Sequence, residues 1–333
     1  MSEIGRRCFL VATGALLAAP FAVQAQPPQR VRRIGFLLGE SADSTAARAT
    51  RSLYIPGFRE IGYEEGVNLA IEWRFTEGKT ERYKPLAEEL IRSKVELIIT
   101  SADDNATEAA LDASRTTPIV MANAGFPVER GLIKSLARPG GNVTGTTYAP
   151  FETSLKQFQL LKEAVPGAKR MAMLTQTPFT PWGKTLFSQL NDHGRSQWMN
   201  FEVFHIARPE ELAETLKRIA AWRPEALFVN TGPVIRTRLD EIAAFAIERR
   251  IPTFSTGVFF VNAGALIYYG PDIPAQLKVT VSYVDRILKG ANPGDLPVEQ
   301  PSRYELALNA KTARAIGFKF PQSLLVRADR VIE

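Results

Sequence analysis

The chain has 333 residues and a formal net charge of +6 at pH 7, from 41 lysines and arginines against 35 aspartates and glutamates. These charges interleave, as in EELIRSKVE from Glu88 to Glu96, which indicates a mixed solvated surface and excludes a dedicated basic face for nucleic acid. One cysteine and two histidines are too few for a metal centre built on thiolates or imidazoles, so we expect neither a metal nor a cofactor.

The first 25 residues have the layout of a secretory signal peptide. A charged start with Arg6-Arg7 precedes an apolar run that a glycine and a proline interrupt, and Val23-Gln24-Ala25 offers small residues at a cleavage site. This run is too short and too interrupted to span a bilayer comfortably. The arginine pair resembles a twin-arginine (Tat) signal and also fits the positive start of a Sec signal, so both export routes remain open. We expect a periplasmic protein that is cleaved near Ala25 and thereby loses Cys8, its only cysteine.

Beyond this segment, short apolar runs rich in β-branched residues alternate with amphipathic stretches. In the first half the apolar runs predict strands at Arg33–Gly39, Asn68–Phe75, Val95–Ser101, Pro118–Asn123 and Val143–Tyr148. The amphipathic stretches predict helices near Ala46–Ile61, Tyr83–Ser93, Asn105–Ser114 and Val128–Ser135.

The second half repeats this plan. Its apolar runs predict strands at Arg170–Thr175, Phe201–Ile206, Ala226–Asn230, Pro252–Ser255 and Ala265–Tyr268. Its amphipathic stretches predict helices near Gly183–Asp192, Pro209–Ala221, Arg236–Arg249 and Pro274–Leu288. Strands that alternate with helices in this way imply right-handed βαβ units and a parallel sheet.

The two halves also resemble each other in detail. RTTPIVMANAG and RRIPTFSTGVF each place a proline at the start of a short strand that follows a helix. We therefore predict an α/β protein with two doubly wound parallel-sheet lobes joined by a hinge in the Gly- and Pro-rich stretch LARPGGNVTGTTYAPFETS. The expected boundaries are 30–148 for the first lobe and 149–271 for the second, with 272–333 divided between them.

Polar residues follow most of the predicted strands, at the edge where doubly wound sheets bind ligands. They are hydroxyls, amides and one acidic pair, without a base–nucleophile couple or a carboxylate–histidine cluster, so they favour binding a small polar ligand over catalysis. We predict no catalytic residue, and ligand contacts from Ser41, Ser101, Asp103, Asn123, Gln176, Asn230, Thr231 and Thr256.

Some of these residues have a structural alternative. Asp103 or Asp104 either holds a ligand group or only caps the helix that follows, because aspartate is favoured at helix N-termini. Asn230 and Thr231 either contact the ligand or only close a turn.

The stretch Gly183-Lys184-Thr185 matches the end of a phosphate-binding loop, G-x-x-x-x-G-K-[ST]. The first glycine of that motif lets backbone N–H groups curl around phosphates, and this chain has Pro178 there, which lacks an N–H. We therefore predict no nucleotide site, and instead a loop that contacts either the ligand or the rim of the ligand cleft.

Several longer stretches carry a family resemblance that covers Val31 to Glu333. SLARPGGNVTG, YYGPD, YVDRILKGANPGDLPVEQP and LALNAKTARAIGF are similar to the ABC transporter substrate-binding protein family that includes tryptophan- and tyrosine-binding proteins. The resemblance implies a type I periplasmic-binding fold, two lobes that close on a ligand, and delivery of the ligand to an ABC permease in the inner membrane.

The resemblance also frames the ligand and the partners. It implies an amino acid or a related carboxylate or amide, and a ligand-sensing subunit of a signalling system is the alternative role. We expect a monomer that binds no nucleic acid. Aromatic residues either wall an apolar part of the ligand or belong to the core, and Tyr268 is the one included among the candidate contacts; the others are Phe126, Tyr148, Phe179 and Trp182.

Overall fold

The computed structural model describes residues 30–333 except 102, 149, 177–180 and 198–199. The predicted signal peptide, Pro178, Phe179 and the side chain of Trp182 lie outside the described residues. Arg32–Glu333 forms one compact unit, and all that follows concerns this unit. No helix in the described part of the chain combines the length and the apolar character that a membrane crossing needs.

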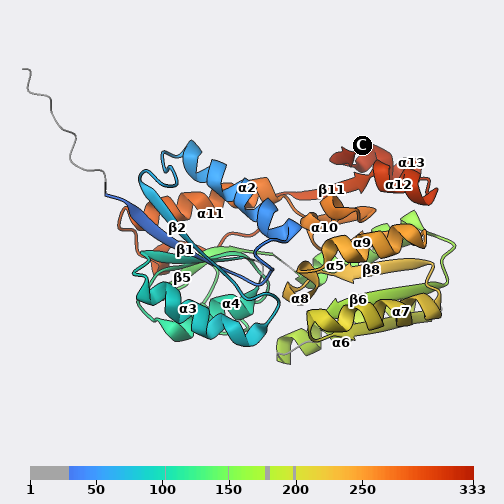
Figure 1. Cartoon of the computed structure of the whole chain (residues 1–333), viewed down its shortest axis with the longest axis horizontal. Coiled ribbons are helices and arrows are strands. Elements are labelled where there is room, and N and C mark those ends of the chain that lie inside the picture. Colours follow the sequence, from blue (N-terminus) through green and yellow to red (C-terminus); the bar gives the residue numbers. More distant parts are fainter. Residues whose placement is uncertain (1–29, 102, 149, 177–180, 198–199) are drawn as a thin grey trace, which may run out of the picture. The chain divides into compact units, whose positions relative to one another are not determined.

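The first sheet has five parallel strands in the order β2-β1-β3-β4-β5. This is a doubly wound order, with its switch point between β1 and β3. Helices α2 and α11 pack on one face, and α3 and α4 pack on the other (Figure 1). The bounds are β1 Arg32–Leu38, α2 Thr45–Glu60, β2 Leu69–Phe75, η1 Thr80–Arg82, α3 Tyr83–Arg92, β3 Leu97–Ser101, α4 Asp104–Ala113, β4 Ile119–Ala124 and β5 Val143–Thr147.

The second sheet has seven strands in the order β12-β11-β10-β9-β8-β6-β7. Strands β6 to β10 are parallel and repeat the order of the first sheet, whereas β11 runs antiparallel to β10. Its first elements are α5 Pro150–Ala164, β6 Arg170–Gln176, α6 Pro181–Gln197, β7 Asn200–Ile206, η2 Pro209–Glu211, α7 Leu212–Trp222, β8 Ala226–Asn230, α8 Pro233–Arg236, α9 Leu239–Glu248, β9 Thr253–Ser255, α10 Val258–Ala263 and β10 Ile267–Pro271.

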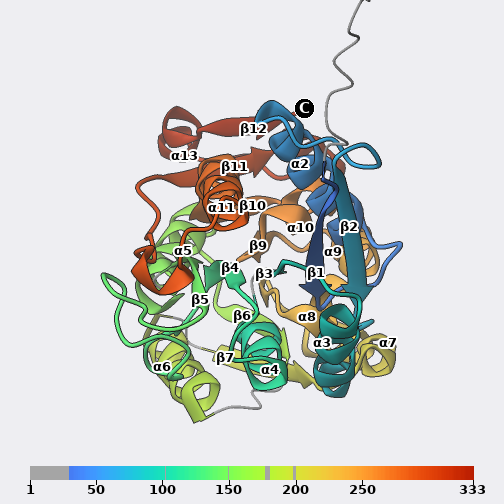
Figure 2. The same ribbon diagram turned by 90° about the vertical axis from the view of Figure 1, so that its left-hand side faces the viewer.

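The last part of the chain visits both sheets. Helix α11 (Ile273–Leu288) leaves the second sheet and buries Val281, Val284 and Ile287 in the same cluster as residues of β1. The chain then returns, and β11 and β12 extend the second sheet (Figure 2). The remaining elements are η3 Pro293–Asp295, β11 Tyr304–Asn309, α12 Ala310–Ile316, α13 Gln322–Arg327 and β12 Arg330–Ile332.

The structure confirms the predicted strands and most of the predicted helices to within a few residues. The helix predicted at Val128–Ser135 is wrong, because this stretch forms turns that Gly131 closes with a positive φ of 70°. Helix α5 was not predicted. Its first residue is a proline, a residue favoured at the first helical position, but the Gly- and Pro-rich run before it was interpreted as a hinge that continues to Ser154.

One glycine is required where β4 and β5 meet. Gly145 lies opposite Met121 in the ladder and has a φ of +134°, and a Cβ atom there would lie 1.9 Å from the carbonyl oxygen of Met121. Neither the backbone conformation nor the space admits a side chain at this position.

Gly145→Ala is therefore expected to lower the free energy of unfolding by about 2–4 kcal/mol, from backbone strain and overpacking together. Urea unfolding followed by circular dichroism measures this. Gly141→Ala is the matched control, because a Cβ at Gly141 meets nothing within 4 Å. Equal stabilities of the two variants would contradict the argument.

Candidate ligand-binding site

A pocket with a cavity volume of about 140 Å³ lies where the carboxyl ends of strands from both sheets meet. Ser101 and Asn123 reach it from the ends of β3 and β4, and Asn230 and Tyr268 reach it from β8 and β10. An engineered protein cavity of about this volume holds a benzene molecule. The pocket therefore has room for a solute with one aromatic ring or an apolar part of that size.

Buried polar atoms without a partner gather in this pocket. Within the described residues, five of its lining side chains have a buried nitrogen or oxygen that makes no hydrogen bond to the protein. Leaving such an atom unpaired costs about 1–3 kcal/mol, so proteins rarely keep several in one place without a use for them. The atoms are Asn123 Oδ1, Thr153 Oγ1, Gln157 Oε1, Arg236 Nε and Gln276 Oε1.

The backbone of Asn123 aims its side chain in an unusual way. This residue has a φ of 61°, in the left-handed region, and lies where the register between β4 and β5 shifts. Asparagine tolerates that region better than most residues, and strained backbone of this kind clusters at ligand sites. Its backbone N–H donates to Thr146 Oγ1 at 2.8 Å, and its side-chain Oδ1 is buried without a partner.

Two helices supply the other amide oxygens. Gln157 on α5 donates from Nε2 to the carbonyl oxygen of Tyr269 at 2.6 Å, and this bond determines which end of the amide remains unpaired. Thr153 lies one turn earlier on the same helix, and Gln276 lies in the first turn of α11. Sequence analysis missed all three residues. It did not predict α5, and although it predicted a helix at Pro274–Leu288 and a crossing of the chain after Asp272, it looked for contacts only at strand ends.

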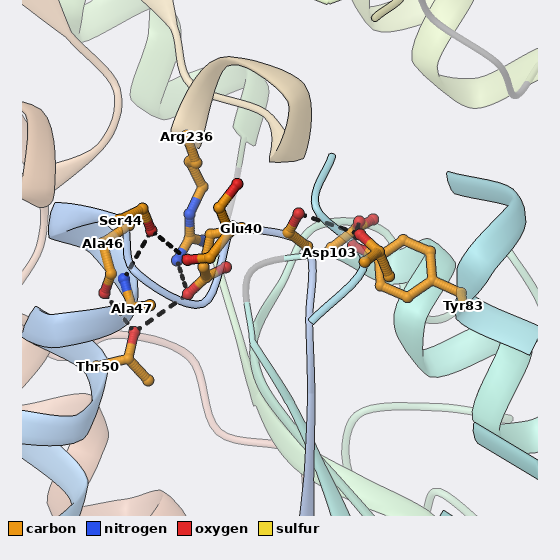
Figure 3. Close-up of polar contacts among 11 residues, drawn as sticks. Glu40, Ser44, Ala46, Ala47, Thr50, Tyr83, Asp103 and Arg236 are labelled. Atoms are coloured by element: carbon orange, nitrogen blue, oxygen red, sulfur yellow. Dashed lines mark hydrogen bonds and ion pairs between the residues drawn. The ribbon is translucent and has the colours of Figure 1, made fainter. Parts of the chain in front are cut away.

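Arg236 is the only lining residue in the described part of the chain with a full charge at neutral pH. It ends α8, and its Nη2 donates to Glu40 Oε1 at 3.1 Å, with 8% and 1% of the two side chains exposed (Figure 3). Glu40 follows β1 of the first sheet and also accepts a hydrogen bond from Thr50. The guanidinium lies over the ring of Phe259, 5.3 Å from its centroid.

Neither residue of this ion pair was among the predicted ligand contacts, although Glu40 belongs to the strand end Gly39-Glu40-Ser41 from which Ser41 was predicted. Arg236 was assigned to a predicted helix. The one local signal that could have placed it near the ligand edge is Gly232-Pro233, which lies between the predicted strand Ala226–Asn230 and Arg236. Only the folded chain brings it to Glu40.

Six of the nine predicted contacts line the pocket. Asn230, Thr231 and Thr256 also bond to one another: Thr231 N–H donates to Thr256 Oγ1 at 2.9 Å, and Thr256 Oγ1 donates to Asn230 Oδ1 at 3.4 Å. Asn230 and Thr231 therefore face the pocket, and their bonds to Thr256 connect the end of β8 to the residue that follows β9. The six residues are Ser101, Asn123, Asn230, Thr231, Thr256 and Tyr268.

Three predicted contacts lie away from the lining. The carbonyl oxygen of Ser41 accepts the hydroxyl of Ser44, in the turn before α2. Gln176 Oε1 accepts the N–H of Val234 at 3.3 Å, beside α8. Asp103 is the N-cap of α4, where its carboxylate accepts the N–H of Asn105 at 2.9 Å and the hydroxyl of Tyr83 (Figure 3).

Aromatic side chains form much of the apolar wall. Tyr148 and Tyr268 both line the pocket, and burial raises the pKa of each hydroxyl far above its ordinary value, so both stay neutral. The hydroxyl of Tyr268 donates to the carbonyl oxygen of Pro271 at 2.9 Å, which leaves its ring for contact with a ligand. Tyr54, Phe259 and Phe260 also belong to this wall, whereas Phe126 lies outside it.

Comparison with known proteins decides the family. The sequence model of the ABC transporter substrate binding protein family matches residues 42–332. The chain belongs to this family. It is 27% identical over 266 residues to the tyrosine-binding protein of Clostridioides difficile (strain R20291), a match that covers 79% of this chain and 75% of that protein.

Solved structures agree with the fold of this substrate-binding protein. The ABC domain of Streptococcus pneumoniae in complex with L-Trp superposes with a TM-score of 0.77 at 24% identity, over 91% of this chain and 100% of that chain. A conserved domain protein from Vibrio cholerae gives 0.76 at 22% identity, over 91% and 99%. The predicted two-lobed α/β fold is confirmed, and the family is one of binding proteins rather than enzymes, as predicted.

Two buried carboxylates at the start of α4, Asp103 and Asp104, lead us to expect that the stability of this substrate-binding protein depends on pH. Burial raises the pKa of the Asp103 carboxyl to about 6, although hydrogen bonds from Tyr83 and Asn105 act in the opposite direction. Burial also raises the pKa of Asp104, whose carboxylate accepts the N–H groups of Gly125 and Phe126. The folded state therefore binds the Asp103 proton more tightly than the unfolded state, and the free energy of unfolding falls as pH rises from about 4 to about 6.

Asp103→Asn removes this buried charge and keeps the cap, because asparagine caps helices about as well as aspartate. From pH 4 to pH 7.5 the parent should therefore lose about 1–3 kcal/mol of stability relative to the variant, at about 1.4 kcal/mol per pKa unit. Urea unfolding at both pH values measures the difference. Asp112→Asn, at a carboxylate whose side chain is 57% exposed on the same helix, should show no such change. If the difference in the free energy of unfolding between the parent and Asp103→Asn is the same at both pH values, the pKa of Asp103 is not raised.

Proposed function

We propose that this protein is the periplasmic solute-binding receptor of an ABC importer. It captures a small polar or aromatic solute, an amino acid or a related carboxylate or amide, and delivers it to an ABC permease in the inner membrane. The observation that carries the proposal is the cluster of five unpartnered polar atoms in a cavity of about 140 Å³. Such a lining is typical of a site that hydrogen-bonds a solute.

The family relatives support this class of ligand. One relative is a tyrosine-binding protein, and one structure with the same fold contains L-Trp. The ring-sized cavity and its aromatic wall suit solutes of that kind. The ligand contacts proposed here are the six predicted residues of the lining together with Gln157, Arg236 and Gln276.

Two features support the location and the mode of action. The signal peptide predicted in the first 25 residues implies export to the periplasm. The lobes proposed at 30–148 and 149–271, with 272–333 divided between them, are linked by three crossings of the chain, beside Tyr148, Pro271 and Glu299. Because only a few segments connect them, two such lobes can rotate about a hinge and close on a ligand.

The ligand site itself is tested by Gln276→Leu. The Gln276 oxygen is buried and unpartnered, so its loss should leave the stability of the ligand-free protein equal or higher, while affinity falls by roughly 2- to 100-fold for one lost hydrogen bond. Thermal shift and calorimetry with tyrosine, tryptophan and phenylalanine measure both effects. Gln322→Leu, at an exposed position outside the lining, should leave affinity unchanged. Unchanged affinity in Gln276→Leu would remove this residue from the site.

Hinge closure should be visible in solution. Small-angle scattering of the mature protein is expected to give a smaller radius of gyration at saturating ligand than without ligand, because the lobes approach each other. An identical profile at saturation would argue against a closing receptor. Uptake of the same ligand by vesicles that contain the permease distinguishes an importer subunit from the alternative, a ligand-sensing subunit of a signalling system.

A further inference from the structure

The net charge of the pocket depends on a residue that does not line it. Arg236 is the only charged side chain among the lining residues that the structure describes, and no aspartate or glutamate is among them. Its guanidinium is bonded to Glu40, a carboxylate that is fully buried behind the lining. Arginine and glutamate together bring no net charge to the site.

Burial prevents either partner from leaving the pair. A charge buried without a counter-charge is strongly unfavourable, and breaking a buried pair is far more damaging than never having built it. A ligand carboxylate that drew Arg236 away would leave Glu40 buried alone. A ligand ammonium would find no carboxylate in the lining. Glu40 accepts bonds from Arg236 and Thr50 at Oε1, and its Oε2 is buried without a hydrogen-bond partner, outside the lining (Figure 3).

The ionisable groups around the pair do not change this balance. Burial raises the pKa of Tyr54 and Tyr83 well above the ordinary value, so both hydroxyls are neutral. The Asp103 carboxylate is bonded to Tyr83 and to the start of α4, and it does not line the pocket (Figure 3). The lining therefore presents a neutral surface to a solute.

The unpartnered atoms show what that solute must offer. Three are amide oxygens, of Asn123, Gln157 and Gln276, and these only accept hydrogen bonds. Arg236 Nε only donates, and Thr153 can do either. A complementary solute has several N–H or O–H donors and one acceptor next to its ring.

We infer that the Glu40–Arg236 pair makes this pocket selective for solutes without net charge, either uncharged or zwitterionic, and that Glu40 is a specificity-determining residue. This inference rests on the proposed function, since it names the charge class of the solute that the same pocket binds. An amide and an amino acid share the required chemistry: N–H donors, an acceptor for Arg236 and zero net charge.

Two matched series of solutes test the inference on the mature protein. One is tyrosine, tyramine, 4-hydroxyphenylacetate and 4-hydroxyphenylacetamide; the other is tryptophan, tryptamine, indole-3-acetate and indole-3-acetamide. Each holds the ring constant and varies the charge. Calorimetry should show the zwitterion or the amide, or both, binding at least roughly tenfold more tightly than the cation and the anion, the loss expected for one poorly matched charged contact. Which of the two neutral forms is preferred identifies the solute class.

Neutralising one partner of the pair at a time should shift the charge preference for the solute in opposite directions. Glu40→Gln leaves Arg236 without its counter-charge and should shift the preference toward the anion by roughly tenfold or more, whereas Arg236→Gln should shift it toward the cation by a similar factor. The double variant Glu40→Gln/Arg236→Gln should again prefer neutral solutes. Lys289→Gln, which breaks the exposed pair with Asp285, should leave the preference as in the parent. A purely structural role of the pair would not produce opposite shifts.

The outcomes separate this inference from the function on which it rests. Tight binding of the anion or the cation by the parent overturns the inference and leaves a solute receptor in place. Folded single variants that keep the parental preference overturn it as well. If a single variant does not fold, the charge preferences of the parent and of the double variant test the inference. If no member of either series stabilises or binds the parent, both the inference and the proposed class of solute are wrong.

Discussion

Parallel pairing of the strands is the constraint on which the site depends. In both sheets the parallel strands end at one edge, so residues that are far apart in the sequence meet there without any local signal between them. Ser101 and Asn123 from the first sheet face the same pocket as Asn230 and Tyr268 from the second. The same order of strands in both sheets, with one switch point in each, makes the two edges alike. The pocket between them is lined by polar strand ends and closed by residues of α5, α8 and α11.

Several side chains of the proposed binding pocket are arranged at a cost in stability. The amide oxygens of Gln157 and Gln276 are buried without a hydrogen-bond partner, and Asn123 has a strained, left-handed backbone. A well-packed core avoids both features. The fully buried cores on both faces of each sheet, built on residues such as Phe36 and Phe228, supply the stability that tolerates these local costs. The buried Glu40–Arg236 pair is a further such cost, because a buried ion pair often contributes less to stability than well-packed apolar groups of similar volume.

Sequence reasoning recovered the elements that obey local rules. Alternating and continuous apolar runs located β1 to β10, and the strand-end rule found Asn230, Thr231 and Thr256. It failed where local signals conflict. Val128–Ser135 has helical spacing, but Pro127 and Gly131 turn the chain, and the Gly- and Pro-rich run before α5 concealed the start of that helix. Asp103 shows the same limit, since an aspartate before a helix suits both a cap and a ligand contact. In the structure it accepts the N–H of Asn105, as a cap does, and the hydroxyl of Tyr83.

The sequence by itself determined the two doubly wound sheets and the polar character of the strand ends, because both follow from periodicity and composition within short windows. It also indicated the family, through the resemblance of longer stretches such as SLARPGGNVTG. Only the tertiary structure decided which helices face the pocket and what charge the pocket has. Gln157 and Gln276 lie on helices whose orientation depends on how the chain crosses between the sheets. Glu40 and Arg236 are 196 residues apart, and nothing near either residue indicates the other. Their pairing results from packing of the whole chain, since a buried charge is stable only where the fold places its partner.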